Sequence, residues 1–283
     1  MERIERIGII VKPNAPEIQK ILKNSFEWIS SNNLIPVLEK KAAEILGKEK
    51  GVSRNEIAEK SDLILVLGGD GTLLSIAPYA AKERKPVLGI NVGTLGFIAE
   101  TTLEEMFDIL DKTIKGNAPV SLRSMLSIKI EKKEFTALND VVIAKGALSR
   151  IVELKVSINE KFLVSVRGDG IIISTPTGST AYSLSAGGPI AEPSIKSIIF
   201  TPICPHTLSI RPMILPEDSK ISVEMVNTNE DIHITIDGQK GPKMEIDTPI
   251  LVTLSPFQLK LIASPYRNFF DLLQEKLKWS GKL

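Results

Sequence analysis

A glycine-rich turn with one carboxylate is the first feature of the chain that could do chemistry. Residues 68–72 read Gly-Gly-Asp-Gly-Thr and directly follow a continuous apolar run, Leu63–Leu67. Glycines let backbone amides approach an anionic group closely, whereas the carboxylate of Asp70 has the wrong charge to bind phosphate itself. Asp70 could instead accept a proton from an attacking hydroxyl, or act on a phosphate through a divalent cation. Both roles indicate phosphoryl transfer. On these five residues alone, a Gly-Asp-Gly turn held by an Asx hydrogen bond is an equally good interpretation.

Two further segments carry polar groups suited to a ligand. Ser174–Pro189 is rich in small and hydroxyl-bearing residues, is longer than a turn requires, and contains Tyr182, which can present a flat face to a base. The alternative is a flexible linker, which the tyrosine, the prolines and the apolar run before the segment disfavour. Asn139-Asp140 could contact a ribose or a base edge, although such a pair taken alone is more often a turn.

Several familiar signatures are missing from the sequence. It has no Gly-x-x-x-x-Gly-Lys-Ser/Thr loop, no Gly-x-Ser-x-Gly elbow and no Gly-x-Gly-x-x-Gly spacing, which disfavours P-loop enzymes, α/β-hydrolases and ordinary dinucleotide oxidoreductases. One cysteine, Cys204, and two histidines, His206 and His233, cannot supply a structural zinc site. No cluster of carboxylates has a spacing that identifies a protein-held ion site.

Alternating strands and helices must position the glycine turn. Apolar runs at Ile7–Val11, Leu63–Leu67 and Pro86–Ile90 are typical of buried strands, and helical periodicity follows the first of them from Ile18. Asn14 with Glu17 has the spacing of a capping box for that helix. This alternation predicts βαβ units and an open, mostly parallel, Rossmann-like sheet, which places ligands at the carboxyl ends of its strands.

The pattern changes near Lys115–Pro119 and becomes a succession of short strands. We therefore expect an α/β domain over residues 1–117, joined by a C-terminal helix within 266–283, and an all-β, sandwich-like domain over 118–265 that binds the substrate. In the second domain, strands are predicted at Leu126–Ile130, Leu154–Ile158, Phe162–Val166, Ile171–Ser174, Ile221–Val226, Ile232–Ile236, Ile250–Leu254 and Leu259–Ala263.

Composition narrows the classes of partner. The 283 residues are 43% hydrophobic and 24% charged with a net charge of +1, which indicates a globular protein without a broad basic field for nucleic acid. No stretch approaches the roughly 18 apolar residues of a membrane span, and the first residues lack the apolar length of a signal peptide. We expect a cytoplasmic protein that binds small molecules, without a nucleic-acid or membrane partner.

Taken together, the order and spacing of the segments resemble the NAD kinase family over most of the chain. The glycine turn alone is shared with diacylglycerol kinases, sphingosine kinases and phosphofructokinases, whereas its combination with the long glycine-rich motif is specific. The matching segments are Gly68–Thr72, Asn91–Phe97, Leu138–Asp140, Arg167–Gly170, Thr175–Pro189 and the last helix, Phe269–Trp279.

The resemblance implies an ATP-dependent transfer of phosphate to the 2′-hydroxyl of the adenosine ribose of NAD, giving NADP. It implies an N-terminal α/β domain and a C-terminal β-sandwich-like domain with substrate held between them, assembled as a homodimer or homotetramer. The donor would be ATP or polyphosphate, and a divalent cation, Mg²⁺ by preference, would neutralise the donor phosphates.

Carried over position by position, the resemblance also implies a set of site residues. Asp70 matches the proton acceptor, and Gly68, Gly69 and Thr72 match the phosphate-binding turn. Asn139 and Asp140 match a pair that contacts NAD, where the family more often has glutamate at the second position. The remaining residues expected to bind NAD are Gly71, Phe97, Arg150, Arg167, Asp169, Thr180, Ala181, Tyr182, Ser183, Ser185 and Gln239.

Two other functions remain open at this point. A lipid or small-alcohol kinase would keep Asp70 and should have an apolar substrate pocket. A non-catalytic NAD(H) sensor would tolerate loss of the carboxylate, so the presence of Asp70 argues against it.

Overall fold

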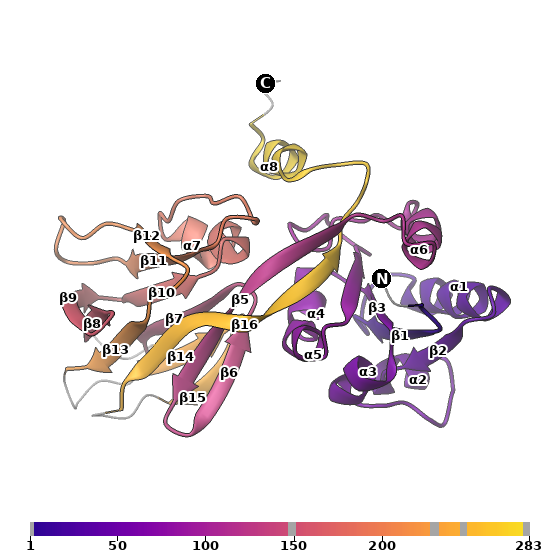
Figure 1. The fold of residues 1–283 in the computed structure, drawn as a ribbon, viewed down its shortest axis with the longest axis horizontal. Coiled ribbons are helices and arrows are strands. Elements are labelled where there is room, and N and C mark those ends of the chain that lie inside the picture. Colours follow the sequence, from indigo (N-terminus) through magenta and orange to yellow (C-terminus); the bar gives the residue numbers. More distant parts are fainter. Residues whose placement is uncertain (1–2, 147–150, 227–231, 244–247, 280–283) are drawn as a thin grey trace. The chain divides into compact units, whose positions relative to one another are not determined.

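The structure, a computed structural model, describes residues 3–146, 151–226, 232–243 and 248–279 (Figure 1). The chain divides into two compact units. Unit 1 comprises Met1–Leu122 and Gln258–Leu283, and unit 2 comprises Arg123–Phe257. No helix in the described ranges is long and apolar enough to cross a membrane.

Unit 1 is an open α/β sheet in the strand order β2-β1-β3-β4-β16, and its pairs are parallel. Its strands are β1 (Arg6–Val11), β2 (Ile35–Leu38), β3 (Leu63–Leu67), β4 (Pro86–Ile90) and the last part of β16 (Ile250–Ile262). Its helices are α1 (Ile18–Ser31), α2 (Lys40–Ile45), α3 (Arg54–Lys60), α4 (Asp70–Leu74), α5 (Ala77–Lys82), α6 (Met106–Ile114) and α8 (Phe269–Leu277).

Both faces of this sheet are covered by helices, as the continuous apolar strands require. Alternate residues of β1 point to opposite faces: Ile7 and Ile9 belong to the apolar core under α1 and α6, whereas Gly8 lies against Ile57 of α3. Figure 1 shows α1 and α6 on one side of the strands, with α3 and α5 on the other.

Unit 2 is built from antiparallel strands in two layers. One sheet has the order β12-β11-β10-β7-β14-β15, and the other joins β16, β13, β8 and β9, with β5 paired to β16 and to β6. The strands not yet given are β5 (Val120–Ile130), which begins in unit 1, β6 (Lys133–Ala137), β7 (Asp140–Lys145), β8 (Val152–Ile158), β9 (Lys161–Gly168), β10 (Gly170–Ser174), β11 (Ser197–Ile203), β12 (Met213–Pro216), β13 (Ile221–Met225), β14 (Ile232–Ile236) and β15 (Gln239–Lys243). Two short helical turns, η1 (Thr177–Thr180) and α7 (Tyr182–Ser185), follow β10.

One apolar core lies between the two layers of unit 2. Ile171 and Ile173 of β10 belong to the same buried cluster as Val152, Leu154 and Val156 of β8. Side chains of two sheets that meet in this way define a β-sandwich. The expected fold class, an open α/β part followed by an all-β part, is confirmed.

Two local expectations were wrong. Helix α1 has no capping box from Asn14: it begins at Ile18, its N-cap is Glu17 with a φ of 53°, and no side chain caps it. Pro16 explains the difference, because a proline disfavours helical backbone in the residue before it, here Ala15. The strands predicted at Ile250–Leu254 and Leu259–Ala263 are a single strand, β16.

Candidate active site

The carboxylate of Asp70 stands at the carboxyl end of a buried parallel strand. Strand β3 ends at Leu67, the chain turns through two glycines, and Asp70 is the first residue of α4. Gly69 and Gly71 have open space where a side chain would lie, so this face of the turn is accessible to a ligand. The carboxyl end of a strand in an open α/β sheet is where such folds bind their ligands.

Three consecutive backbone amides of the loop after β4 hold this carboxylate. Asp70 Oδ1 accepts hydrogen bonds from the amides of Ile98 (3.2 Å) and Ala99 (2.8 Å), and Oδ2 accepts one from Phe97 (3.0 Å). A carboxylate offers about four lone-pair positions. The three amides therefore fix the orientation of Asp70 and leave Oδ2 able to accept one further proton or hydrogen bond.

Helix α8 contacts the same loop from the far end of the sequence. The ammonium group of Lys276 donates to the carbonyl of Leu95, and its nitrogen lies 5.7 Å from the centre of the Phe97 ring. On the apolar side of the helix, Leu272 and Leu273 are buried. The helix begins with a capping box formed by Asn268 and Asp271. Phe97, expected to bind NAD, is thus positioned by α8 as well as by its own loop.

In unit 2, Asn139 and Asp140 lie where three segments meet. The backbone amide of Thr175 donates to the carbonyl of Asn139 (2.9 Å), and the Thr175 hydroxyl donates to the carbonyl of Leu138 (2.6 Å). A Cβ atom at Gly178 would overlap the carbonyl of Asn139, so glycine is required for this close approach. Part of the glycine-rich segment and the Asn-Asp pair are therefore brought together, as expected if both bind the same ligand.

The third segment is the hairpin between β14 and β15. The carboxylate of Asp237 accepts hydrogen bonds from the amides of Leu138 (2.8 Å), Asn139 (2.7 Å) and Asp140 (3.1 Å). Burial raises the pKa of Asp237 from 3.8 to about 6, against the lowering effect of these amides. Burial, together with the negative charge of Asp237, raises the pKa of the Asp140 carboxyl from 3.8 to about 7. Asp140 is therefore partly protonated near neutral pH and can donate a hydrogen bond as well as accept one.

The side chains of the segment around Tyr182 differ in their exposure to solvent. Tyr182 is the first residue of α7 and 48% of its surface is exposed, so its ring is free to stack on a base. Ser185 is exposed, whereas Ser183 is buried and its hydroxyl hydrogen-bonds that of Thr201 (2.9 Å). Thr180 and Ala181 are half-buried at the turn between η1 and α7. The side chain of Ser183 thus supports the loop from inside.

The other residues expected to bind NAD lie on strands and their ends. Asp169, between β9 and β10, forms an ion pair with Lys145 of β7 (2.8 Å). Arg167 is exposed on β9, 3.9 Å from Glu153 of the adjacent strand. Gln239 is the exposed first residue of β15. Arg150 lies outside the described residues.

Three positioning groups were missed by the sequence prediction. They are Asp237, Lys145 and Gly96, which leaves space for the Asp70 carboxylate. Only Asp237 had a usable signal, since Asp-Gly between two alternating apolar runs indicates a tight hairpin turn. Its partners are 97 to 99 residues away in the sequence, so the contact itself could not be predicted.

The described residues do not fit a protein-held metal ion. Among them, no group of three or more histidine, cysteine, aspartate or glutamate side chains is placed to hold one. We therefore assign no step of the reaction to a metal bound by this chain's side chains.

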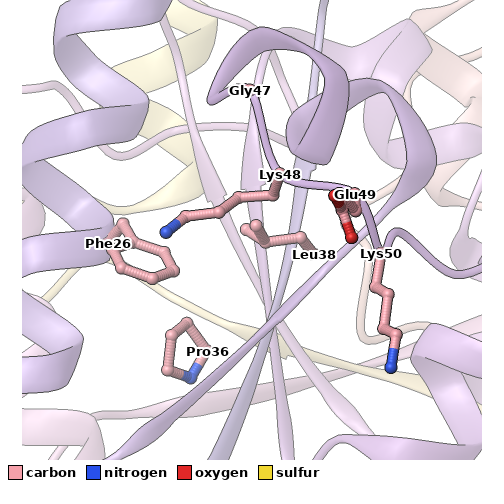
Figure 2. A pocket seen from close by; sticks show the side chains of 7 residues that line it. All are labelled: Phe26, Pro36, Leu38, Gly47, Lys48, Glu49 and Lys50. Carbon is pink, nitrogen blue, oxygen red and sulfur yellow. The ribbon is translucent and has the colours of Figure 1, made fainter.

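A separate hollow of about 460 Å³ lies on unit 1 beside the edge strand β2 (Figure 2). Phe26, Pro36 and Leu38 form its apolar part, and residues 47–50 its polar rim. The ammonium group of Lys48 already lies over the Phe26 ring, 5.3 Å from its centre. None of the residues expected from the sequence to form the site lines this hollow.

Family models match both parts of the chain. Residues 7–118 match the ATP-NAD kinase N-terminal domain, and residues 138–264 match the ATP-NAD kinase C-terminal domain. With the α/β unit, the all-β unit and the glycine turn, these matches define a two-domain kinase.

Full-length relatives make the assignment specific. An NAD kinase of Geobacter sulfurreducens is 40% identical over 284 residues, covering 99% of this chain and 100% of the relative. An NAD kinase of Syntrophotalea carbinolica is 41% identical over 285 residues with the same coverage. The chain belongs to the NAD kinase family. The family and the enzyme class expected from the sequence are confirmed.

Solved structures agree on the fold. A yeast NADH kinase complexed with NADH superposes with a TM-score of 0.91 at 26% identity, covering 100% of this chain and 90% of that one. An NAD kinase from Archaeoglobus fulgidus in complex with ATP gives a TM-score of 0.79 at 23% identity, covering 96% of this chain and 98% of that one.

Proposed function

We propose that this NAD kinase transfers the terminal phosphate of ATP to the 2′-hydroxyl of the adenosine ribose of NAD, with Asp70 as the proton acceptor. The role of Asp70 is supported by the three hydrogen bonds that its carboxylate accepts from the backbone amides of Phe97, Ile98 and Ala99. They hold the carboxylate at the carboxyl end of β3 and leave one acceptor position on Oδ2.

A ribose hydroxyl is a weak nucleophile at neutral pH, so a carboxylate within about 3 Å of it assists the attack. The 2′-oxygen forms a bond to the γ-phosphorus as the bond from that phosphorus to the β–γ bridging oxygen breaks. The hydroxyl proton passes to Oδ2 of Asp70, and ADP leaves with the bridging oxygen. Phosphoryl transfer needs little more from the protein than positioning and charge stabilisation.

The β-rich part of the chain, residues 118–265, supplies most of the proposed NAD site. Asn139 and Asp140 contact the dinucleotide through side chains whose backbone is fixed by Thr175 and Asp237. The exposed ring of Tyr182 stacks on a base. The remaining members of the proposed site are Gly71, Phe97, Arg150, Arg167, Asp169, Thr180, Ala181, Ser183, Ser185 and Gln239.

Donor phosphates need neutralising charge as well as amides. Gly68, Gly69 and Thr72 belong to the turn that we propose to face the phosphates. Because the described residues form no carboxylate cluster, a divalent cation such as Mg²⁺ would enter bound to the triphosphate. The family name supports ATP as donor; use of polyphosphate and assembly into a homodimer or homotetramer are further parts of the proposal.

One assay tests the reaction and its donor. Purified protein is incubated with NAD, ATP and Mg²⁺, and NADP is followed with an NADP-specific dehydrogenase beside an Asp70→Asn control. NADP that forms with wild type and is lost in the control supports both the reaction and the residue. NADP that forms with polyphosphate but not with ATP keeps the reaction and changes the proposed donor. Measurable NAD binding without product from either donor contradicts the proposed kinase reaction.

A further inference from the structure

The hairpin turn that contains Asp237 departs from an ordinary surface turn. Asp237 and Gly238 join β14 to β15 with positive φ angles of 48° and 73°, and Ile236 pairs with Gln239 across the turn. Two-residue turns of this kind favour Asp-Gly for its backbone conformation alone. Here Gly238 and Gln239 are exposed, but the carboxylate of Asp237 turns inward.

The carboxylate reaches three consecutive amides of a distant segment. Its Oδ2 accepts from Leu138, and its Oδ1 accepts from Asn139 and Asp140, at 2.7 to 3.1 Å. The amide of Asp237 in turn donates to the carbonyl of Asp140 (3.0 Å). Hydrogen bonds to a charged acceptor are about twice as strong as neutral ones. Loss of this acceptor would leave three amides in need of partners.

The opposite side of the same segment is held by Thr175. Its backbone amide and hydroxyl bind the carbonyls of Asn139 and Leu138 respectively. Amides bound by Asp237 and carbonyls bound by Thr175 leave the backbone at residues 138–139 with little freedom. The side-chain oxygen of Asn139 is buried and has no hydrogen-bond partner among the described residues. A rigid backbone thus presents an unpaired polar group.

We propose that Asp237 is a positioning residue for NAD: its carboxylate fixes the backbone of Leu138–Asp140 so that the side chains of Asn139 and Asp140 meet the dinucleotide. The inference rests on the proposed role of that pair in NAD binding. Asp237 itself need not touch NAD. Its effect is on the affinity for NAD and not on the phosphoryl-transfer step, where Asp70 acts.

Two substitutions of graded severity test this role. Asp237→Asn keeps the volume and one acceptor oxygen, whereas Asp237→Ala removes every acceptor. We expect Asp237→Asn to raise both the Kd and the KM for NAD by about tenfold, and Asp237→Ala to raise them further. The KM for ATP and kcat should stay within about twofold of wild type, since neither depends on Asn139. Asp218→Asn, an exposed aspartate in the turn between β12 and β13, is the matched control and should leave all four constants unchanged.

The readouts separate positioning from general support of the fold. If the wild-type protein forms NADP and Asp237→Asn has an unchanged Kd for NAD, the inference about Asp237 is wrong while the proposed kinase reaction stands. The inference is also wrong if the KM values for NAD and ATP rise equally, or if kcat falls while the Kd for NAD is unchanged. If wild type binds NAD but forms no NADP, the kinase proposal fails while the Kd comparison still decides the role of Asp237. Asp237→Asn decides the question even if Asp237→Ala does not fold.

Discussion

Gly96 provides the space that the carboxylate of Asp70 occupies. A Cβ atom at position 96 would overlap both the Cγ and the Oδ1 of Asp70, and Gly96 is itself buried. The proposed proton acceptor is therefore held by two features of one loop: the amides of residues 97–99 attract it, and the missing side chain at residue 96 admits it. Activity should be sensitive to changes at residue 96 that leave Asp70 intact.

Removing the charge of Asp70 should stop the chemistry and spare substrate binding. For Asp70→Asn we expect a fall in kcat of about 10² or more with the Kd for NAD nearly unchanged, because a general base acts on the transition state and not on the ground state. Coupled NADP formation and NAD titration of the same preparation measure both. Wild-type turnover in this variant would exclude Asp70 as the base.

Asp62 offers a matched control for that substitution. It lies in the same unit, and its Oδ2 accepts the amides of Glu5 (3.0 Å) and Arg6 (2.8 Å), so it is also a carboxylate bound by backbone amides. Asp62→Asn should keep wild-type turnover. A similar loss in both variants would indicate that activity falls because the fold is weakened.

A methyl group at residue 96 should displace Asp70 without removing it. We expect Gly96→Ala to lower kcat by at least tenfold, since a shift of about 1 Å in a catalytic group can cost as much as 10². Gly93→Ala is the control, because its nearest contact to a new Cβ is 3.9 Å away. Steady-state kinetics beside thermal unfolding would check the prediction, which is wrong if Gly96→Ala retains full turnover.

The ring of Tyr182 should contribute to NAD affinity by stacking. Replacement by alanine is expected to weaken binding by about 1–3 kcal/mol, the range for an aromatic side chain stacked on a base. Tyr182→Phe keeps the ring and should keep the affinity. Because Tyr182 is 48% exposed, neither change should lower the melting temperature much. Equal dissociation constants for the alanine and phenylalanine variants would remove Tyr182 from the site.

Asp140 should make stability fall as pH rises. Its pKa is raised to about 7 in the folded protein, mainly by burial, so between about pH 4 and pH 7 the folded chain binds more protons than the unfolded chain. The free energy of unfolding therefore decreases through that window, and above it the buried carboxylate opposes Asp237. Burial also raises the pKa of Asp237 to about 6, so Asp237 adds to this dependence below about pH 6. Asp140→Asn should therefore weaken the dependence, most clearly between pH 6 and pH 8, and raise the melting temperature at pH 8. Thermal melts from pH 5 to pH 8 measure it, and a parallel shift at every pH would contradict the assignment.

Local patterns were sufficient to predict the elements that carry the glycine turn. The continuous apolar run Leu63–Leu67, the two glycines that end it and the charge of Asp70 are all visible in the sequence. The error at Asn14 arose from one competing local rule, the restriction that Pro16 places on the residue before it. The two strands predicted at Ile250–Leu254 and Leu259–Ala263 are one strand, β16, which contains Pro256. This proline lies between the stretch paired in register with β13 (Ile250–Val252) and the stretch paired with β4 (Lys260–Leu261).

Contacts between residues far apart in the sequence could not be predicted from such local patterns. Asp237 reaches amides about a hundred residues earlier, and Asp70 binds amides 27 to 29 residues later. A backbone amide has no side-chain signature, so nothing in the sequence marks residues 97–99 or 138–140 as donors. The family resemblance supplied the residues proposed for the site, but not the groups that orient them.

The split of unit 1 into two stretches has a consequence for how the protein is made. Strand β4 pairs with β3 on one side and with Lys260 and Leu261 of β16 on the other, and this last part of β16 is translated only after the whole of unit 2. A nascent chain that has emerged as far as residue 122 therefore has an apolar strand with one unpaired edge, which invites pairing with other chains. The loop that orients Asp70 also lacks its contact with Lys276 until then. On the ribosome, the first unit to begin folding is the last to be completed.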